Sequence, residues 1–295
     1  MTTFARFKDA LLKFKPTDFH SKATPFPEFE IPELNTSKLK TFYAPFDYVN
    51  ADAKLVLVGI TPGAEQMNRA LLAACQSLHA GHSDKDVLQQ AKLPASFSGG
   101  MRNVLYGLLD KYRINEYLGI ESCEELWGES NHDVHFTSTL RNPTFIAKDL
   151  KNYTGGSPVA LDKHPLLKRH IQTLAVELNA SKDSMIIPLG EKVARVIQMM
   201  VDEKLLPLSR VLNFEGRVAE FPHPSKSNKE SVNLAMLDEL PEQADYVKEM
   251  WDDYVIKMSK EEDSKLMAKS SYEKKRISYY VRATHTRNAL NQLMS

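Results

Sequence analysis

The sequence has few of the features that mark secreted, membrane-bound or iron–sulfur proteins. Its 295 residues include two cysteines, Cys75 and Cys123, which are too few for a disulfide framework or a four-thiolate cluster built from this chain alone. No apolar run approaches the ~18 residues needed to cross a membrane. The N-terminal stretch MTTFARFKDALLKF also lacks the apolar segment of a signal peptide. We therefore expect a cytoplasmic protein with no membrane partner.

The sequence also lacks net charge, because 38 lysines and arginines balance 38 aspartates and glutamates. The balance conceals an asymmetry: residues 238–263 hold ten carboxylates and three lysines, which leaves 35 basic and 28 acidic residues elsewhere. A modest basic surface of this kind suits a polyanion, although charges of this kind can also be simply solvated.

Hydrophobic patterning predicts strands that alternate with helices. Apolar or alternating stretches predict strands at 54–58, 134–140, 184–190 and 217–221, and helical spacing follows Gly63, Gly99 and Gly190. This alternation predicts a three-layer α/β/α domain around a mainly parallel sheet of four to five strands. A short helix near the N-terminus and an extended proline-rich connector at 23–33 precede it, and residues 242–270 read as a charged helical segment.

Ligands of such sheets bind beyond the carboxyl ends of the strands, which is where the first motif lies. Residues 59–63, GITPG, follow the first strand and form a Gly-x-x-Pro-Gly turn. Its glycines allow a ligand close to the backbone, and the following helix N-terminus favours negative charge. Alternatively, it is an ordinary strand-to-helix turn. Neither Gly-x-Gly-x-x-Gly nor Gly-Lys-Ser/Thr is present, so dinucleotide and P-loop sites are poorly supported.

The second motif, FPHPSKSN at 221–228, follows the last predicted strand. His223 stands between two prolines, which restrict the backbone and can fix the direction of its ring. The hydroxyls, amide and lysines that follow suit contacts with phosphate. The alternative is a surface turn that caps the helix starting near Glu230.

Together these motifs resemble those of the uracil-DNA glycosylase superfamily. Between them, IIPLGEKVA at 186–194 is similar to the apolar strand and Leu-Gly turn of its thermophile-type branch, and SFSGGMRNVL at 96–105 partly matches a further motif. The resemblance spans residues 42–237, flanked by an N-terminal helix and connector at 1–41 and a charged helical extension at 238–295. It implies a monofunctional DNA glycosylase that acts on double- or single-stranded DNA, with no cofactor, no metal and no obligate protein partner.

The resemblance also implies roles for individual residues. His223 would donate a hydrogen bond to the carbonyl oxygen of the departing pyrimidine, and Phe97 would stack on the extruded base unless it is a core aromatic. The other expected substrate-binding residues are Gly59, Ile60, Pro62, Gly63, Ala64, Gln66, Ser138, Thr139 and Asn142. The expected DNA contacts are Gly99, Gly155, Gly156 and the minor-groove loop of Pro224, Ser225, Lys226, Ser227 and Asn228. No lysine stands at a motif position, so we expect hydrolysis without Schiff-base chemistry.

Three departures from the family pattern bear on mechanism and substrate. Thr61 stands where many members have Asn or Asp to orient the attacking water. Either Thr61 and the backbone orient the water here, or Glu65 helps to do so. Alternatively, Glu65 is only a first-turn carboxylate that interacts favourably with the helix dipole. The base-reading strand offers hydroxyls in place of the usual asparagine. Gly63 stands where a tyrosine blocks 5-substituted bases in the classical uracil enzymes. A site open at C5 favours a 5-substituted pyrimidine, such as the glucosylated hydroxymethylcytosine of phage DNA, slightly over uracil.

Other functions remain open from the sequence. The chain could be a non-catalytic protein that binds lesions or abasic sites, a uracil or mismatch repair glycosylase, or a nucleotide-processing enzyme. Two histidine pairs, His79 with His82 and His132 with His135, lack a third ligand at convincing spacing, so no metal site is predicted.

Overall fold

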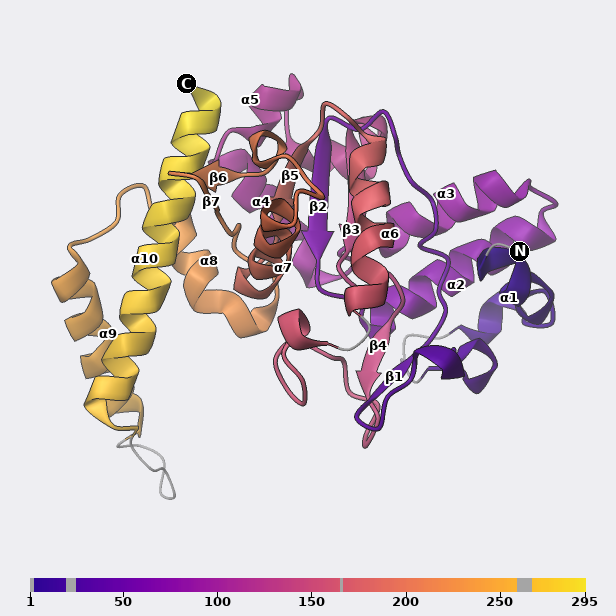
Figure 1. Cartoon of the computed structure of the whole chain (residues 1–295), viewed down its shortest axis with the longest axis horizontal. Coiled ribbons are helices and arrows are strands. Elements are labelled where there is room, and N and C mark those ends of the chain that lie inside the picture. The colour runs from indigo at the N-terminus through magenta and orange to yellow at the C-terminus, as the bar shows by residue number, and fades with distance from the viewer. Residues whose placement is uncertain (1–2, 20–24, 165–166, 259–266) are drawn as a thin grey trace.

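The computed structural model describes residues 3–19, 25–164, 167–258 and 267–295. At its centre lies a parallel sheet in the order β3–β2–β5, formed by Val134–Ser138, Leu55–Gly59 and Met185–Pro188 (Figure 1). Leu57 of β2 lies opposite Phe136 of β3 and Ile187 of β5. Every residue of β2 is buried, as expected of a parallel strand that is covered on both faces.

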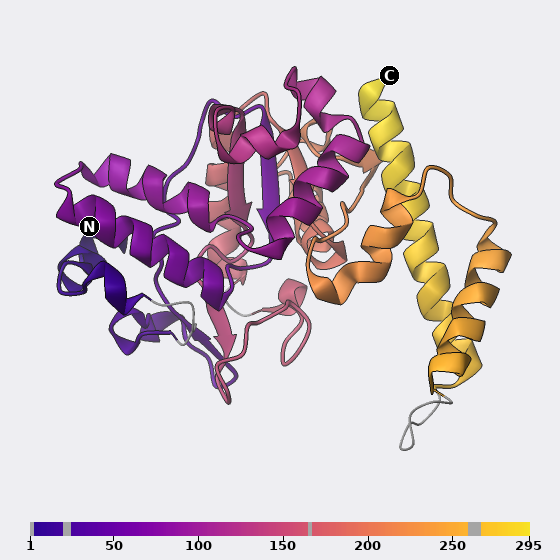
Figure 2. The same cartoon turned by 180° about the vertical axis from the view of Figure 1, so that it is seen from behind.

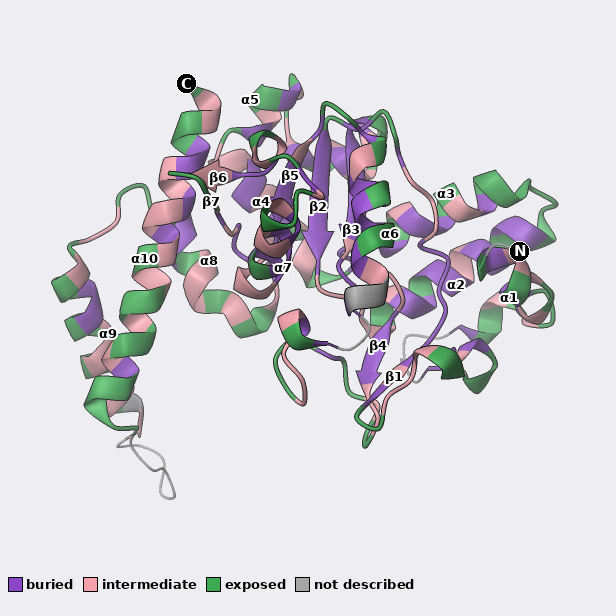
Figure 3. Ribbon diagram, in the orientation of Figure 1, coloured by how far each residue is buried: buried purple, intermediate pink, exposed green. Residues whose placement is uncertain are grey.

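Helices cover both faces of the sheet, which confirms the three-layer α/β fold (Figures 1 and 2). On one face, Val56 and Val58 pack against α6 (Leu167–Ala180) and α7 (Glu191–Asp202). On the other, Leu55 and Leu57 pack against α4 (Gly100–Lys111). Figure 3 shows the strands buried between helices whose outer faces are exposed.

A second group of helices packs beside the sheet. Helix α2 (Ala64–His79) begins at the Gly63 turn and buries the apolar face that the sequence predicted, including Met67, Leu71 and Cys75. It packs against α3 (Asp84–Ala95) and α1 (Thr3–Leu11) in one core. This packing places the N-terminal segment against the domain.

The described part of the C-terminal region consists of α9 (Gln243–Met258) and the long helix α10 (Lys269–Met294). The expected helix at 242–270 therefore ends at or after Met258, and residues 259–266 lie outside the described ranges. Helix α10 packs on α9, α8 (Lys229–Met236) and β6 (Asn213–Phe214). No helix within the described ranges is both long and apolar enough to cross a membrane.

The strand expected at 217–221 differs from the structure. Arg217–Val218 form β7, which pairs with β6 as a hairpin because Glu215 and Gly216 turn the chain with φ values of 50° and 78°. Beyond the hairpin, a single parallel bridge joins Phe221 to Leu189. The central sheet therefore has three strands in the described chain, with isolated bridges in place of a fourth.

The proline-rich connector also differs from an extended chain. In its described part it forms two 3-10 turns, Pro27–Phe29 and Pro32–Leu34. Each turn begins with a proline, whose fixed φ suits the first position of a helical turn. A short two-stranded sheet of β1 (Leu39–Thr41) and β4 (Thr144–Ile146) follows, and α5 (Ile114–Leu118) lies near the amino ends of the central strands.

Candidate active site

The carboxyl ends of the three parallel strands border a cavity of about 500 Å³. The two sequence motifs meet there although they are far apart in the chain: residues 59–63 and His223 both line it. Phe97, Ser138 and Gly190 also belong to the wall. The geometry agrees with the rule that parallel sheets place ligands at this edge.

The first motif brings an aromatic ring and a hydroxyl together over the end of β2. A Cβ added at Gly59 would lie 3.4 Å from Ser138 Oγ and 3.5 Å from Phe97 Cζ, so glycine permits this close approach. Phe97 is 6% exposed and has a φ of 47°, a strained value for a residue with a side chain. It packs edge-on against Phe136, with ring centroids 5.9 Å apart, while lining the cavity. Phe97 is thus both a core aromatic and part of the cavity wall.

Thr61 joins the motif to the loop between β3 and β4. Its hydroxyl donates to the carbonyl oxygen of Asn142 at 2.9 Å and accepts from the amide of Thr144 at 3.2 Å. Because a hydroxyl has one proton, a water beside Thr61 meets only a remaining oxygen lone pair. The side chain of Asn142 does not line the cavity, and its carbonyl oxygen serves this tie.

Glu65 lies outside the cavity wall on the first turn of α2. Its side chain is exposed and forms an ion pair with Arg69 at 3.1 Å. Its carboxylate also lies against Gly99, where an added Cβ would come within 3.0 Å of Oε1. Gln66, by contrast, lines the cavity and accepts the amide of Gly63 at 2.7 Å, capping the helix.

His223 is held in one orientation by its own loop. Its Nδ1 accepts the backbone amide of Ser225 at 3.2 Å, which places the proton of the neutral ring on Nε2. Burial and the charge of Lys192 lower the pKa of His223 to about 4, so the ring is neutral near pH 7. His223 therefore offers the cavity an uncharged N–H donor.

Gly190 fixes the position of the His223 loop. Its amide donates to the carbonyl oxygen of Phe221 at 2.7 Å, and the amide of Phe221 donates to that of Pro188 at 2.8 Å. Gly190 has a φ of 90°, and an added Cβ would lie 3.3 Å from the Cβ of His223. Glycine is therefore required both by the backbone and by the close approach of the histidine.

The expected DNA contacts divide into two groups. Ser225, Ser227 and Asn228 line the cavity, and Lys226 is an exposed member of the same 3-10 turn. The other expected DNA contacts, Gly99, Gly155, Gly156 and Pro224, lie outside the wall, as do the expected substrate-binding residues Ala64 and Thr139. Of these, Gly155 and Gly156 lie against Lys192, whose ammonium donates to the carbonyl oxygen of Thr154 at 2.7 Å.

An amide that the sequence did not reveal stands beside Gly63. A Cβ added at Gly63 would lie 3.1 Å from Nδ2 of Asn152, and Oδ1 of Asn152 accepts the amide of Ala64 at 3.0 Å. The amide of Asn152, from the segment after β4, therefore lies where a side chain at Gly63 would project. No local sequence pattern marks Asn152, because it reaches Gly63 through tertiary structure: the chain turns back after β4, and Asn152 forms an antiparallel bridge with Phe145.

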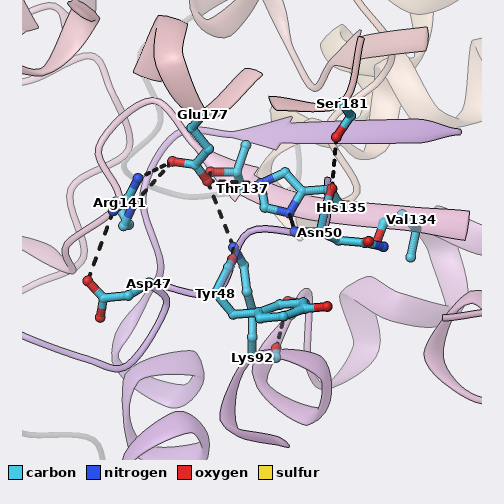
Figure 4. Close-up of polar contacts among 11 residues, drawn as sticks. Asp47, Tyr48, Asn50, Lys92, Val134, His135, Thr137, Arg141, Glu177 and Ser181 are labelled. Atoms are coloured by element: carbon cyan, nitrogen blue, oxygen red, sulfur yellow. Dashed lines mark hydrogen bonds and ion pairs between the residues drawn. The ribbon is translucent and has the colours of Figure 1, made fainter. Parts of the chain in front are cut away.

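The sequence also missed the charged residues of the wall. Lys92 and Arg141 line the cavity and meet at the buried carboxylate of Glu177 (Figure 4). Near His223, the wall includes Glu220 and, from α10, Arg282, which lie 3.2 Å apart. Burial raises the pKa of Glu220 to about 7, although the charge of Arg282 opposes the shift.

Comparisons with known proteins agree with this architecture. The model of the family described as "Uracil DNA glycosylase superfamily" matches residues 46–254. A protein of Bacillus subtilis (strain 168) named "Uncharacterized protein YoxB" is 35% identical over 195 residues, which cover 65% of this chain and 73% of the Bacillus protein. No solved structure matches the chain. The chain therefore belongs to the uracil-DNA glycosylase superfamily, whose members are DNA glycosylases.

Proposed function

We propose that the protein is a monofunctional DNA glycosylase that removes a flipped 5-substituted pyrimidine from DNA. The glucosylated hydroxymethylcytosine of phage DNA is the favoured substrate over uracil, and the product is an abasic site. The observation that carries the proposal is the neutral N–H donor of His223, fixed by Ser225 in the wall of a cavity that also contains Phe97.

The chemistry follows from what each side chain can supply. Extrusion of the base costs a few kcal/mol, which stacking on an aromatic ring such as Phe97 offsets. As the glycosidic bond breaks, the base carbonyl oxygen gains negative charge and the sugar becomes oxocarbenium-like. The Nε2–H of His223 donates to that oxygen, while water attacks C1′. Water, and not a lysine, supplies the oxygen that bonds to C1′, so no enzyme-bound covalent intermediate forms, and the proton that the water loses neutralises the departing base anion.

The attacking water needs a hydrogen-bonding partner near the end of β2. Thr61 can accept a hydrogen bond from a water through one lone pair, together with backbone groups of the motif. Glu65 would have to leave its pair with Arg69 to reach the cavity. A Glu65→Gln variant tests that role directly, since release by this variant at the wild-type rate would eliminate it.

The preference for a 5-substituted base rests on the surroundings of Gly63. Gly63 itself carries no side chain, and the amide of Asn152 that lies against it can hydrogen-bond a polar substituent. The cavity of about 500 Å³ lies within the range of sites that hold drug-sized ligands. A pyrimidine with a sugar on C5 would use this space more fully than uracil.

A non-catalytic lesion-binding function is the second candidate, and Thr61 supports it because its only hydroxyl proton is engaged by Asn142. Duplexes and single strands containing uracil, mismatched thymine, hydroxymethylcytosine or its glucosylated form distinguish the two after treatment with alkali. We expect abasic sites in the glucosylated substrate, with slower release of uracil. Binding without release would favour the second candidate, and neither binding nor release would exclude both.

A further inference from the structure

Two positively charged side chains on a buried support line the cavity. Lys92 extends from α3 with a side chain only 6% exposed, yet it lines the cavity. Arg141 follows β3 and lines the same cavity, with 26% of its side chain exposed. Both approach the carboxylate of Glu177 from α6, which is 2% exposed (Figure 4).

Glu177 is saturated by its neighbours. Its Oε1 accepts from His135 Nε2 at 2.9 Å and from Thr137 Oγ1 at 2.7 Å, and its Oε2 accepts from Arg141 Nε at 3.1 Å and from a terminal guanidinium nitrogen. Burial opposes its ionisation, but these contacts and the charge of Lys92 hold the pKa of Glu177 well below its usual range. A carboxylate with four donors has little capacity left for a ligand, so its part is to position the groups around it.

The two cations retain donors that Glu177 does not use. The Lys92 ammonium donates to the carbonyl oxygen of Tyr48 and lies 3.8 Å from Glu177 Oε1. An ammonium has three N–H groups, and 3.8 Å is an ion-pair distance rather than a hydrogen bond, so the bond to Tyr48 leaves two among the described residues. Arg141 uses Nε and one terminal nitrogen on Glu177, and its other terminal nitrogen lies 4.0 Å from Asp47. Both cations have no acceptor atoms in their side chains.

Lys92 and Arg141 share the cavity with the residues that are proposed to hold the base. Phe97 and Ser138 close over Gly59 at the strand end, and His223 lies on the side of the β5 end. Phe97, Ser138, His223, Lys92 and Arg141 line one cavity, so a base held there shares it with the two cations. Ser138 adds a hydroxyl, which can donate or accept a hydrogen bond.

We propose that Lys92 and Arg141, positioned by Glu177, select pyrimidines that present oxygen acceptors on the edge away from the sugar. This inference rests on the proposed function. The acceptors can be a C4 carbonyl or the hydroxyl oxygens of a sugar on C5. An unmodified cytosine is disfavoured because its 4-amino group is a donor and it has no oxygen substituent on C5 to accept from the cations. The glucosylated base has the same amino group but supplies the hydroxyl oxygens of its sugar. In this proposal the two cations discriminate between bases, as an asparagine on the base-reading strand does in other members of the family.

Binding to DNA that resists cleavage tests the selection without turnover. The probes are duplexes with one 2′-fluoroarabino nucleotide carrying uracil, cytosine or glucosylated hydroxymethylcytosine, and a duplex with a tetrahydrofuran abasic analogue. We expect the wild type to bind at least one of the two oxygen-rich bases roughly tenfold or more tightly than cytosine. Preference for uracil alone identifies the carbonyl as the group read, and preference for the glucosylated base alone identifies the sugar.

Lys92→Met removes the charge from a buried position while keeping an unbranched side chain, and Lys40→Met, which breaks an exposed pair with Glu30, is the matched control. We expect Lys92→Met to lose most of the preference over cytosine and to bind the abasic analogue as the wild type does. Arg141→Gln provides a second test should Lys92→Met fail to fold. Equal weakening on every duplex, the abasic analogue included, would show a structural role and overturn the proposal, as would an unchanged preference.

The pH dependence of the preference gives an independent readout. Lys92 faces Glu177 of α6, Arg141 and His135 of the β3 region, and Asp47 of the loop before β2. Burial lowers the pKa of Lys92 to about 8 and Arg141 adds to this effect, whereas Glu177 and Asp47 oppose it. The preference should therefore decline between pH 7 and 9 in the wild type and be flat in Lys92→Met. A pH-independent wild-type preference would contradict a role for the ammonium.

The two proposals can fail separately. Absence of base release with an intact, Lys92-dependent binding preference contradicts the glycosylase proposal but supports the selection. Release of cytosine as readily as of the oxygen-rich bases contradicts the selection but supports base excision. A covalent DNA adduct that borohydride traps in the wild type and not in Lys92→Met would make Lys92 a nucleophile and overturn its assignment as a reader.

Discussion

Replacement of His223 by alanine is the most direct test of the proposed chemistry. The ring is fixed by the Ser225 amide, which occupies Nδ1 at 3.2 Å and leaves Nε2–H as the donor. A donor aimed at a developing oxyanion is worth about 3–4 kcal/mol, so His223→Ala should slow base release roughly 10²- to 10³-fold. The fold should survive, because the main loss outside the reaction is the acceptor of one amide, worth about 1 kcal/mol.

Single-turnover release at saturating protein concentration measures this step without product dissociation. His132→Ala is the matched control, because the His132 side chain is 74% exposed and lies outside the cavity wall. DNA affinity of His223→Ala should change little, since the donor acts mainly as the bond breaks. A loss smaller than about tenfold would refute the role of this histidine as the principal oxyanion donor.

The pH profile tests the protonation state of the same residue. The pKa of His223 is lowered to about 4 by burial and by Lys192, so the neutral ring predominates at every pH above that value. Protonation would put an N–H on Nδ1, opposite the N–H of Ser225, and remove the contact that orients the ring. Release should therefore be unaffected by His223 from pH 8 down to about 5 and decline toward pH 4. A rate that instead rises below pH 5 would show that the charged imidazolium is the active donor.

Further substitutions probe the surroundings of the cavity. Gly190→Ala should lower the free energy of unfolding, measured in urea, by about 1–3 kcal/mol, because the φ of Gly190 is 90°. The same variant should slow base release in the single-turnover assay, because its new Cβ would displace His223. Thr61→Val should cost about 1–3 kcal/mol of stability by leaving its two backbone partners unpaired, and an unchanged urea midpoint would contradict that tie. Asn152→Ala should reduce binding of the glucosylated base relative to uracil by roughly 2- to 10-fold, measured on the cleavage-resistant duplexes, and an equal effect on both would exclude contact with the substituent. Burial and the charge of Lys92 lower the pKa of His135 to about 4, so the unfolded chain binds the proton more tightly. Its contribution to stability is complete above pH 6.5 and is lost as the pH falls toward 4, by up to about 1.4 kcal/mol per pH unit; His135→Gln should flatten this part of a urea-unfolding series.

The parts of the fold that the sequence predicted are those with strong local patterns. The apolar run at 54–58 and the alternation at 134–140 became β2 and β3, because a parallel strand covered on both faces requires such residues. The prediction of a five-residue strand at 217–221 was wrong in its length and its partner, because Arg217–Val218 pair with β6 through a hairpin at Gly216. The partner of an edge strand is decided by tertiary geometry, which a five-residue pattern does not contain.

The candidate site divides in the same way. Gly59, Gly63 and His223 could be singled out because glycine and proline mark unusual backbone, and the structure brings these residues to one cavity. Lys92 could not, since a lysine on an amphipathic helix ordinarily faces solvent, and its burial depends on Glu177 from another helix. The contribution of the C-terminal helix α10 to the wall could not be predicted either. In the structure its Arg282 forms ion pairs with Glu191 and Glu220 in the cavity wall.

The distribution of charge along the cavity is consistent with the order of events in base release. At the sugar side, His223 is held neutral because burial and the nearby charge of Lys192 both disfavour a second positive charge. A neutral donor stabilises the base oxygen without repelling the positive charge that develops on the sugar. The cations proposed for recognition, Lys92 and Arg141, line the same cavity and are paired with Glu177. If they contact the base edge away from the sugar, recognition by cations and bond breaking beside a neutral histidine occur on opposite edges of the same ring, and each can be altered by substitution without abolishing the other.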